Sequence, residues 1–486
     1  MARDELYSTS FLKGGKEMDP QTRTERDSLG EHIVPAQAYY GVQTARARDN
    51  FPISGLHAHP ELIRATALIK QAAAEAHLAL GELDADRARA IIQAASEIAA
   101  GQWHDQFVVD VFQAGAGTSH NMNANEVIAN RAIEILGGQR GDYSKVHPND
   151  HVNMGQSTND VFPTAMRLAC LPMVGKLTAS LLGLQVALAR KGQEFDRLLK
   201  SGRTHLQDAV PIRLGQEFTA YALSIAKCVQ RIESASKGLF ELGLGATAVG
   251  TGLNTSQAYR KEVIARLREL TGLDLQPAQN YIELTQNTDA FLELSGALRL
   301  LVADLIRIAN DLRLLSSGPM TGLAEIELPP MQPGSSIMPG KVNPVIAEMM
   351  NMVCFQVMGN DLTISLACQA GQLELNVMMP VMAFALLFSL EILTNAIKVL
   401  KNRCVEGITA DERRCTEYLH HSLGLATALN PYLGYAKAAE VARQALHERR
   451  SIREVVLERG LLTAQQLDEI LNPERMTEPP EKRGDR

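Results

Sequence analysis

One apolar stripe between residues 291 and 315 constrains the fold of this chain more than any other feature. Its members recur at alternating steps of three and four residues, which places them on one face of an α-helix. Further apolar residues widen that face, so we expect a helix buried on several sides at the centre of a bundle. The stripe consists of Phe291, Leu294, Leu298, Leu301, Leu305, Ile308, Leu312 and Leu315.

Other long helices are predicted by composition. Helices of about 25 residues would each reach nearly 40 Å, longer than a compact domain needs. The chain is therefore predicted to be mainly α, with a central long-helix bundle and a tendency to oligomerise. The additional long segments are 172–200, 212–241, 344–368 and 380–404, and shorter helices are expected at 60–80 and 84–100.

The flanks of the bundle differ from it and indicate separate parts. Two capping boxes, Ser451 to Glu454 and Thr463 to Gln466, mark short helices near the end, with Gly460 placed as a C-terminal cap. We expect a disordered extension at 1–20, an N-terminal mixed or helical domain at 21–157, a central bundle at 158–404, a small helical domain at 405–473 and a frayed tail at 474–486.

Composition excludes several classes of function. The net charge of −7 argues against a nucleic-acid partner, whose binding surface would be basic. Six cysteines without CxxC spacing predict reduced thiols in a cytoplasmic protein, with neither disulfides nor a metal site. No secretory signal is visible, and the apolar run 377–390 is predicted to be a buried helix too short to span a membrane.

The segment 334–344 carries the strongest chemical signal, with the sequence Gly-Ser-Ser-Ile-Met-Pro-Gly-Lys-Val-Asn-Pro. Its glycines and prolines predict an irregular loop, and Gly334 and Gly340 could serve as hinges of a flap. One interpretation is a polar surface loop. The sharper one is a loop that closes on a small anionic substrate, with hydroxyls and backbone N–H groups around developing oxygen charge.

Three other segments are rich in hydroxyls and small residues. They are Gly-Thr-Ser-His-Asn-Met-Asn at 117–123, Gln-Ser-Thr-Asn-Asp at 156–160 and Gly-Arg-Thr-His-Leu-Gln-Asp at 202–208. Taken alone, the run at 157–159 is typical of the cap of a helix that starts near Pro163. An acidic molecule that binds an anion needs local positive charge, which makes Lys341 and Arg203 candidates.

Together these segments resemble the aspartase/fumarase superfamily, whose members cleave C–N or C–O bonds and release fumarate. The resemblance covers about residues 20–475 and implies a three-domain fold. It also implies a homotetramer with a shared helical core and active sites assembled from three chains.

The resemblance assigns roles within the 334–344 loop. Ser335 is the implied catalytic base, and it needs N–H donors, expected at a helix start near Pro344, and a cation such as Lys341. Ser336 would donate to the β-carboxylate of the substrate, with Ile337 and Met338 contributing backbone groups. Lys341 and Asn343 would anchor the α-carboxylate.

The resemblance also assigns residues outside that loop. Thr118, Ser157 and Thr158 would contact the β-carboxylate, and Asn159 would lie near the amine. Thr204 and the catalytic His205 belong to the Gly-Arg-Thr-His segment, and Glu348 would support His205 from the second shell. His120 departs from the family pattern, where a small or hydroxyl residue is usual, so it could alter the pocket.

Within the superfamily the chain resembles the aspartate ammonia-lyase branch more than the fumarases. The segments that carry this preference are 314–319, 370–376 and 451–460. Fumarate hydratase is the alternative, and a structural protein on the same scaffold is a third hypothesis. The implied reaction needs a dicarboxylate substrate and no cofactor or metal, although activation by Mg²⁺ is possible.

Overall fold

The computed structural model describes residues 21–478 and divides the chain into two compact units. The first unit holds the described residues through Ala169 together with Phe240–Thr288 and Ala367–Phe384. The second unit holds Cys170–Leu239, Asp289–Leu366 and the chain from Ala385 onward. The predictions for residues 1–20 and 479–486 lie outside the described residues.

The first unit consists of packed helices and a short antiparallel hairpin. Thr22 pairs with Pro35 at one end of that hairpin and Asp27 with Gly30 at the other. The helices predicted at 60–80 and 84–100 are confirmed as α2 and α3, which pack together with α4 around alanine, valine and isoleucine side chains. The elements are β1 Thr22–Asp27, β2 Gly30–Pro35, α1 Val42–Asn50, α2 Pro60–Ala79, α3 Ala85–Ala99, α4 Thr118–Ile135, β5 Glu241–Leu242, α7 Gln257–Thr271, β6 Gln276–Pro277 and α8 Tyr281–Gln286.

Helix α5, Thr158–Glu194, corrects the predicted boundaries in this region. The sequence indicated a helix start near Pro163 and a separate helix over 172–200, because an internal proline costs roughly 3 kcal/mol. One helix instead runs through both Pro163 and Pro172. Its side chains are mostly buried on several faces, so tertiary packing outweighs the backbone penalty of the prolines.

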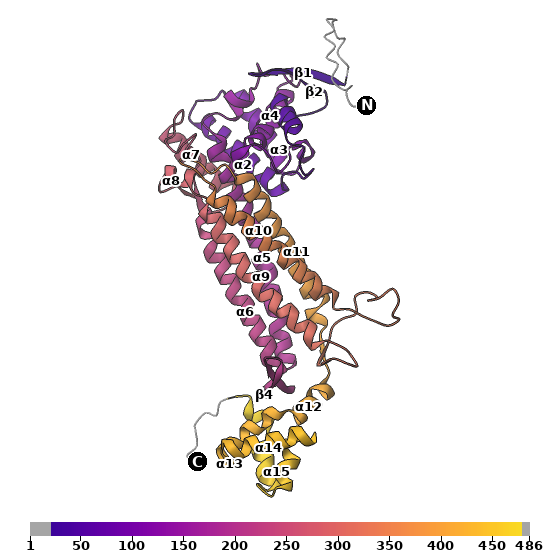
Figure 1. Ribbon diagram of the computed structural model, residues 1–486. Coiled ribbons are helices and arrows are strands. Elements are labelled where there is room, and N and C mark those ends of the chain that lie inside the picture. The colour runs from indigo at the N-terminus through magenta and orange to yellow at the C-terminus, as the bar shows by residue number, and fades with distance from the viewer. Residues whose placement is uncertain (1–20, 479–486) are drawn as a thin grey trace, which may run out of the picture. The chain divides into compact units, whose positions relative to one another are not determined.

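The second unit contains the long-helix bundle, in which α6, α9, α10 and α11 run side by side (Figure 1). The apolar stripe of residues 291–315 is confirmed as the buried face of α9. Polar bonds also join α9 to α6, since Ser224 and Tyr221 donate to Asp304 and Asp311. The bounds are α6 Leu214–Ala235, α9 Asp289–Leu315, α10 Val345–Gln369 and α11 Met379–Arg403.

A hairpin and a group of short helices complete the second unit. Both predicted capping boxes are present, and Gly460 follows the last helical turn with φ of 62°. The elements are β3 Leu199–Thr204, β4 Gln207–Arg213, β7 Ile326–Glu327, β8 Thr409–Ala410, α12 Glu412–His421, α13 Asn430–Leu433, α14 Tyr435–Glu448, α15 Ile452–Glu458 and α16 Ala464–Ile470.

The predicted frayed tail at 474–486 is wrong at its start. Thr477 accepts hydrogen bonds from Arg213 and Gln216, and Glu478 forms an ion pair with Arg213. These bonds fasten the chain through Glu478 to the start of α6. The predicted three-part domain division stays a prediction.

Five of the six cysteines are buried, and Cys368 is partly exposed. Burial raises the pKa of the Cys354, Cys404 and Cys415 thiols to about 12. Within the described residues, Thr158–Glu194 and Met379–Gly407 have the length and apolar composition that a membrane span requires. An 18-residue apolar window in each is already 50% and 67% buried, respectively. The helix predicted over 380–404 is confirmed as the buried α11, and the apolar run 377–390 enters that helix at Met379.

Candidate active site

The predicted site residues form two groups, one in each unit. The first group lies at the N-terminal ends of α4 and α5. The second group lies on the β3–β4 hairpin, on the loop before α10 and in the first turn of α10. The first group is Thr118, Ser157, Thr158 and Asn159, and the second is Thr204, His205, Ser335, Ser336, Ile337, Met338, Lys341, Asn343 and Glu348.

Ser157 caps α5 in the manner that the sequence allowed. Its Oγ accepts the Asn159 N–H at 3.2 Å, while the Asp160 carboxylate accepts the Ser157 N–H at 2.9 Å. A serine that accepts a cap bond still has its own O–H to donate. The cap therefore fixes Ser157 without preventing it from binding a carboxylate.

Asp160 ties this helix start to the glycine-rich segment 243–252. Its Oδ2 accepts the N–H groups of Gly245 and Thr247, and Asn159 donates to the Ala248 carbonyl at 2.8 Å. Burial raises the pKa of Asp160 to about 6. The sequence did not indicate that this glycine-rich segment supports the site.

Thr118 is exposed at the first turn of α4, directly after Gly117. Gly117 has φ of +84°, and a Cβ there would lie 2.2 Å from the ring of Phe162. Only glycine permits this close approach between the starts of α4 and α5. The Gly-Thr pair thus holds the Thr118 hydroxyl at the surface of the first unit.

His120 faces the interior, with 2% of its surface exposed. Its Nε2 bonds to the Thr66 hydroxyl at 3.0 Å, and its ring contacts Phe107 and Phe162. Burial and the charge of Lys70 lower the pKa of His120 to about 4, which leaves the ring neutral near pH 7. In the structure it is a core residue of the first unit.

Ser335 receives the donors that a serine base requires. The backbone N–H groups of Ile337 and Met338 point at its Oγ, at 3.2 and 3.0 Å. The sequence placed such donors at the start of α10 near Pro344, whereas the loop itself supplies them. Two N–H groups on one oxygen stabilise a negative charge there, as an oxyanion hole does.

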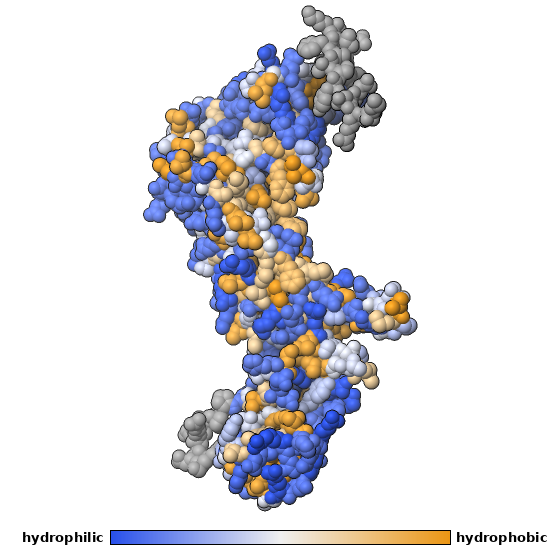
Figure 2. Space-filling view, in the orientation of Figure 1, coloured by the Kyte–Doolittle hydropathy of each residue, from blue (hydrophilic) through white to orange (hydrophobic). Residues whose placement is uncertain are grey.

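The 334–343 loop bonds to itself. Gly334 donates to the Lys341 carbonyl at 2.7 Å, and the Asn343 amide donates to the Gly334 carbonyl at 2.8 Å. Ser335, Met338 and Lys341 help to line a hollow of about 550 Å³ inside it. The loop projects from the bundle in Figure 1, and apolar side chains cover its end in Figure 2; Ile337 is 84% exposed.

His205 and Leu206 form the two-residue turn of the β3–β4 hairpin. Their φ angles are +55° and +59°, which non-glycine residues rarely adopt. Both side chains are exposed, as is Thr204. No hydrogen bond or ion pair connects His205 with Glu348 in the described part of this chain, so their pairing stays a prediction.

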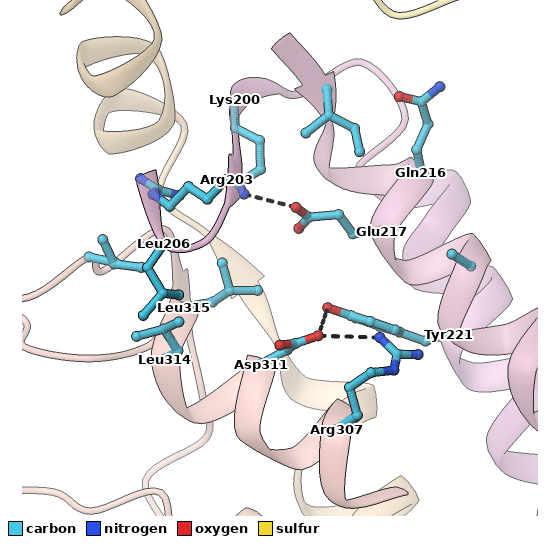
Figure 3. Close-up of a pocket in the computed structure, with 13 residues that line it drawn as sticks. Lys200, Arg203, Leu206, Gln216, Glu217, Tyr221, Arg307, Asp311, Leu314 and Leu315 are labelled. Atoms are coloured by element: carbon cyan, nitrogen blue, oxygen red, sulfur yellow. Dashed lines mark hydrogen bonds and ion pairs between the residues drawn. The ribbon is translucent and has the colours of Figure 1, made fainter. Parts of the chain in front are cut away.

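A pocket of about 320 Å³ lies beside this hairpin (Figure 3). Arg203 makes two bonds to the fully buried Glu325, and Lys200 pairs with Glu325 and Glu217. The charge of Arg203 is therefore neutralised inside the second unit. Arg203 holds the hairpin in place, which leaves Lys341 as the cation available to substrate among the two candidates.

Sequence reasoning missed the buried polar residues behind the first group. Lys70 donates to Asn153, and Asn121 donates both to Asn153 and to Thr158. The only available signal was a single lysine among the alanine and isoleucine residues of α2. Such a lysine is normally expected at the surface.

Comparisons with known proteins give a consistent result. A lyase family model matches residues 30–359, and a model of the fumarase C C-terminus matches residues 425–478. An aspartate ammonia-lyase of Bacillus subtilis (strain 168) is 52% identical over 96% of this chain and 98% of its own length.

Solved structures confirm the predicted fold class. A fumarate lyase:delta crystallin from Brucella melitensis, in a structure bound to cobalt, has a TM-score of 0.91 at 50% identity and covers 94% of this chain and 100% of its own. A class II fumarase from Schistosoma mansoni has a TM-score of 0.90 at 39% identity, covering 94% and 99%.

Proposed function

Because the chain belongs to the lyase family of aspartases and fumarases, we propose that it is an aspartate ammonia-lyase. It converts L-aspartate to fumarate and ammonia, and the reaction is reversible. The observation that carries the chemistry is the Ser335 hydroxyl, which faces two backbone N–H donors within a loop that also holds Lys341. The choice of aspartate over malate is supported by relatives near 50% identity, against 39% for the fumarase.

The reaction starts with Ser335 in its deprotonated alkoxide form, whose charge the two backbone N–H groups stabilise. The Ser335 oxygen takes a proton from Cβ of aspartate and becomes a neutral hydroxyl. The electron pair of the broken C–H bond moves into the adjacent β-carboxylate, which becomes an aci-carboxylate with two negative oxygens. Hydroxyl and backbone donors bind this state more tightly than the substrate, which lowers the barrier. The electron pair then returns to form the C=C bond of fumarate, and the C–N bond breaks to release the amine.

The remaining residues hold the substrate in that geometry. Thr118, Ser157 and Thr158 supply neutral donors for the β-carboxylate, with Ser336 as a further donor. Lys341 and Asn343 anchor the α-carboxylate, and Asn159 and His205 lie near the departing amine. Donors placed in this way make an electron-sink cofactor unnecessary, and activation by Mg²⁺ stays a separate prediction.

The test follows the absorbance of fumarate with aspartate and with malate as separate substrates. We expect fumarate from aspartate, together with ammonia in equal amount. Turnover of malate in place of aspartate would assign the chain to the fumarate hydratases. Turnover of neither substrate by a folded protein would favour a structural role.

We further propose that the active protein is a cytoplasmic homotetramer with sites shared between chains. Each group of site residues is incomplete alone, because the first lacks a base and a cation while the second lacks the hydroxyls of α4 and α5. Helix α10 also exposes an apolar stripe at helical spacing, which is typical of an interface. The stripe is Met352, Phe355, Leu362 and Leu366, each at least 59% exposed.

Mixed tetramers test the shared site. Ser335→Ala and Thr158→Val subunits are denatured together, refolded and checked for mixing by mass. If Ser335 and Thr158 of one site come from different chains, some sites receive both intact residues and a sizeable fraction of activity returns. Mixed tetramers as inactive as their parents would place both residues of each site on one chain.

A further inference from the structure

We propose that Lys70 is a positioning residue for the elimination reaction, and this inference rests on the proposed function. Lys70 acts through two asparagine side chains to turn the Thr158 hydroxyl outward as a donor to the substrate carboxylate. Three observations support the proposal. Lys70 is fully buried, the Asn153 and Asn121 amides are oriented by hydrogen bonds, and the Thr158 hydroxyl accepts a hydrogen bond from the interior.

Lys70 lies on α2 with none of its surface exposed. Its Nζ donates to Asn153 Oδ1 at 2.8 Å and to Gln156 Oε1 at 2.9 Å, and both partners are neutral amides. Burying an ammonium group against neutral partners is costly, so a core position would favour a smaller apolar side chain. Burial lowers the pKa of Lys70 to about 7, and the charge of Asp160 opposes that shift.

The lysine fixes the orientation of the first amide. Asn153 Oδ1 accepts from Lys70 and also from the Nδ2 groups of Asn121 and Asn125, at 3.2 Å each. An amide nitrogen has no lone pair to offer these three donors, so the Asn153 oxygen must face them. Without Lys70 the strongest of these donors is lost and the amide can rotate.

The second amide passes this orientation to the site. Asn121 is 2% exposed, and its Nδ2 donates both to Asn153 Oδ1 and to Thr158 Oγ1, the latter at 3.2 Å. Thr158 Oγ1 therefore accepts on its inner side. Its own hydrogen is left to point away from Asn121, which is the direction needed to donate to a carboxylate.

The same helix supports the neighbouring turn through a second basic residue. His77 lies seven positions after Lys70, and its Nε2 is 2.8 Å from the Met154 carbonyl while its Nδ1 is 2.6 Å from Glu82. Two basic side chains on α2 thus hold residues 153–156, which lead directly into the Ser157–Asn159 group. A purely apolar packing role for this face of α2 would need neither residue.

A double-mutant cycle tests whether Lys70 acts through Thr158. Lys70→Met should lower kcat/KM for aspartate by about tenfold or more in the wild-type background, the effect of one strong hydrogen bond. In the Thr158→Val background the same change should lower the residual kcat/KM, measured at high enzyme concentration, by less than about threefold, because the hydroxyl that Lys70 orients is gone. Equal losses in both backgrounds would overturn the inference, since a general folding defect lowers both alike.

One further variant keeps the test decisive if Lys70→Met folds poorly. Asn121→Asp keeps the shape but replaces the donor with an acceptor, so that Thr158 would donate inward. We expect a loss of about tenfold in kcat/KM per folded protein, together with a lower unfolding temperature because the new carboxylate is buried. Wild-type kcat/KM in Asn121→Asp would overturn the inference.

The matched control is Lys191→Met. Lys191 is also buried, but it bonds to Glu194 and the Ile408 carbonyl, neither of which is a site residue. It should lower stability and leave kcat/KM per folded protein unchanged; an equal loss at Lys191 would mean that any buried lysine has this effect. A wild-type protein that does not deaminate aspartate would refute the proposed function, whereas additive losses in an active enzyme refute only the role of Lys70.

Discussion

Buried side chains hold residues 157–159 in place through hydrogen bonds. Residues 334–343 are held instead by hydrogen bonds within their own loop. The first segment is fixed by Asp160, Lys70 and the glycine-rich segment, all inside the first unit. The hydrogen bonds of the 334–343 loop connect it only to itself and to the first turn of α10, among the residues that the structure describes. The first segment is thus held by the core of the first unit, whereas the 334–343 loop is held by its own backbone.

The difference suggests a division of labour. Neutral donors for a carboxylate gain from being rigid, because preorganised dipoles need no rearrangement as charge develops. A base that must be shielded from water gains from sitting on a flap that closes over the substrate. We therefore expect changes in the 334–343 loop to affect catalysis with little loss of stability, and changes in the first segment to affect both.

The sharpest case is Ser335→Ala. It removes the proposed base from an exposed loop, so kcat should fall by at least about 10³-fold while the unfolding temperature stays within a degree or two of wild type. Steady-state kinetics and thermal unfolding measure the two quantities. An activity loss below tenfold would exclude Ser335 as the base and remove the main contrast between the two regions.

Substitutions at two glycines, Gly117 and Gly340, test whether stability depends more on the first unit's core than on the 334–343 loop. Gly117→Ala places a Cβ against the Phe162 ring at a positive φ, and we expect a loss of about 2–4 kcal/mol from strain and overpacking. Gly340 also has a positive φ, of +80°, but open space surrounds it, so Gly340→Ala should cost only about 1 kcal/mol. Chemical denaturation compares them, and equal losses would contradict the contrast in packing.

Lys341→Met tests binding by the loop. The exposed ammonium group is proposed to hold the α-carboxylate, so its loss should raise KM for aspartate by roughly 10–100-fold, equivalent to about 1.5–3 kcal/mol. The matched control is Lys145→Met in the first unit, which should leave KM unchanged. A KM for the Lys341 variant within twofold of wild type would remove Lys341 from the site.

The last prediction concerns the pH dependence of stability that Lys70 gives to the first unit. The pKa of Lys70 is lowered from 10.5 to about 7, so between these values the unfolded chain binds the extra proton. Stability from this group therefore rises with pH across that window, by at most about 1.4 kcal/mol per pH unit. Asp160 and His120 titrate below it.

The comparison that isolates this effect is wild type against Lys70→Met. The difference in unfolding temperature, wild type minus variant, should increase from pH 7 to pH 9. A difference that stays constant over this range would show that Lys70 does not change its charge there. No matching trend is expected for Ser335→Ala.

Periodic features of the sequence predicted the fold well. Close contacts between segments that are distant in the sequence could not be predicted from it. The stripe at 291–315 identified α9 because helical burial repeats at a fixed interval. The start of α5 was misplaced because Pro163 signals a boundary locally, while the bonds from Asp160 to residues 245 and 247 lie far along the chain. The His205–Leu206 turn was also missed, since neither residue favours a positive φ.

The candidate site shows the same division. Ser335, Lys341 and the hydroxyls of 157–158 could be proposed from the sequence because each lies in a short motif whose members are neighbours along the chain. Lys70 was missed because it is a single polar residue whose meaning depends on a partner in another element. Asn121 lies in the segment 117–123 but received no role, because its partners Asn153 and Thr158 lie elsewhere in the chain. The two N–H donors of Ser335 lay within the motif, but only the bend of the loop brings them to the hydroxyl.

The burial of the native cysteines has a practical consequence for labelling chemistry. Thiol reagents attack the thiolate, so buried cysteines with raised pKa values react slowly at neutral pH. Only Cys368 among the six is partly exposed. A fluorophore or spin label placed on a new surface cysteine at Met338 or Leu206 would therefore report on one chosen position, once Cys368 is replaced, without rebuilding the core.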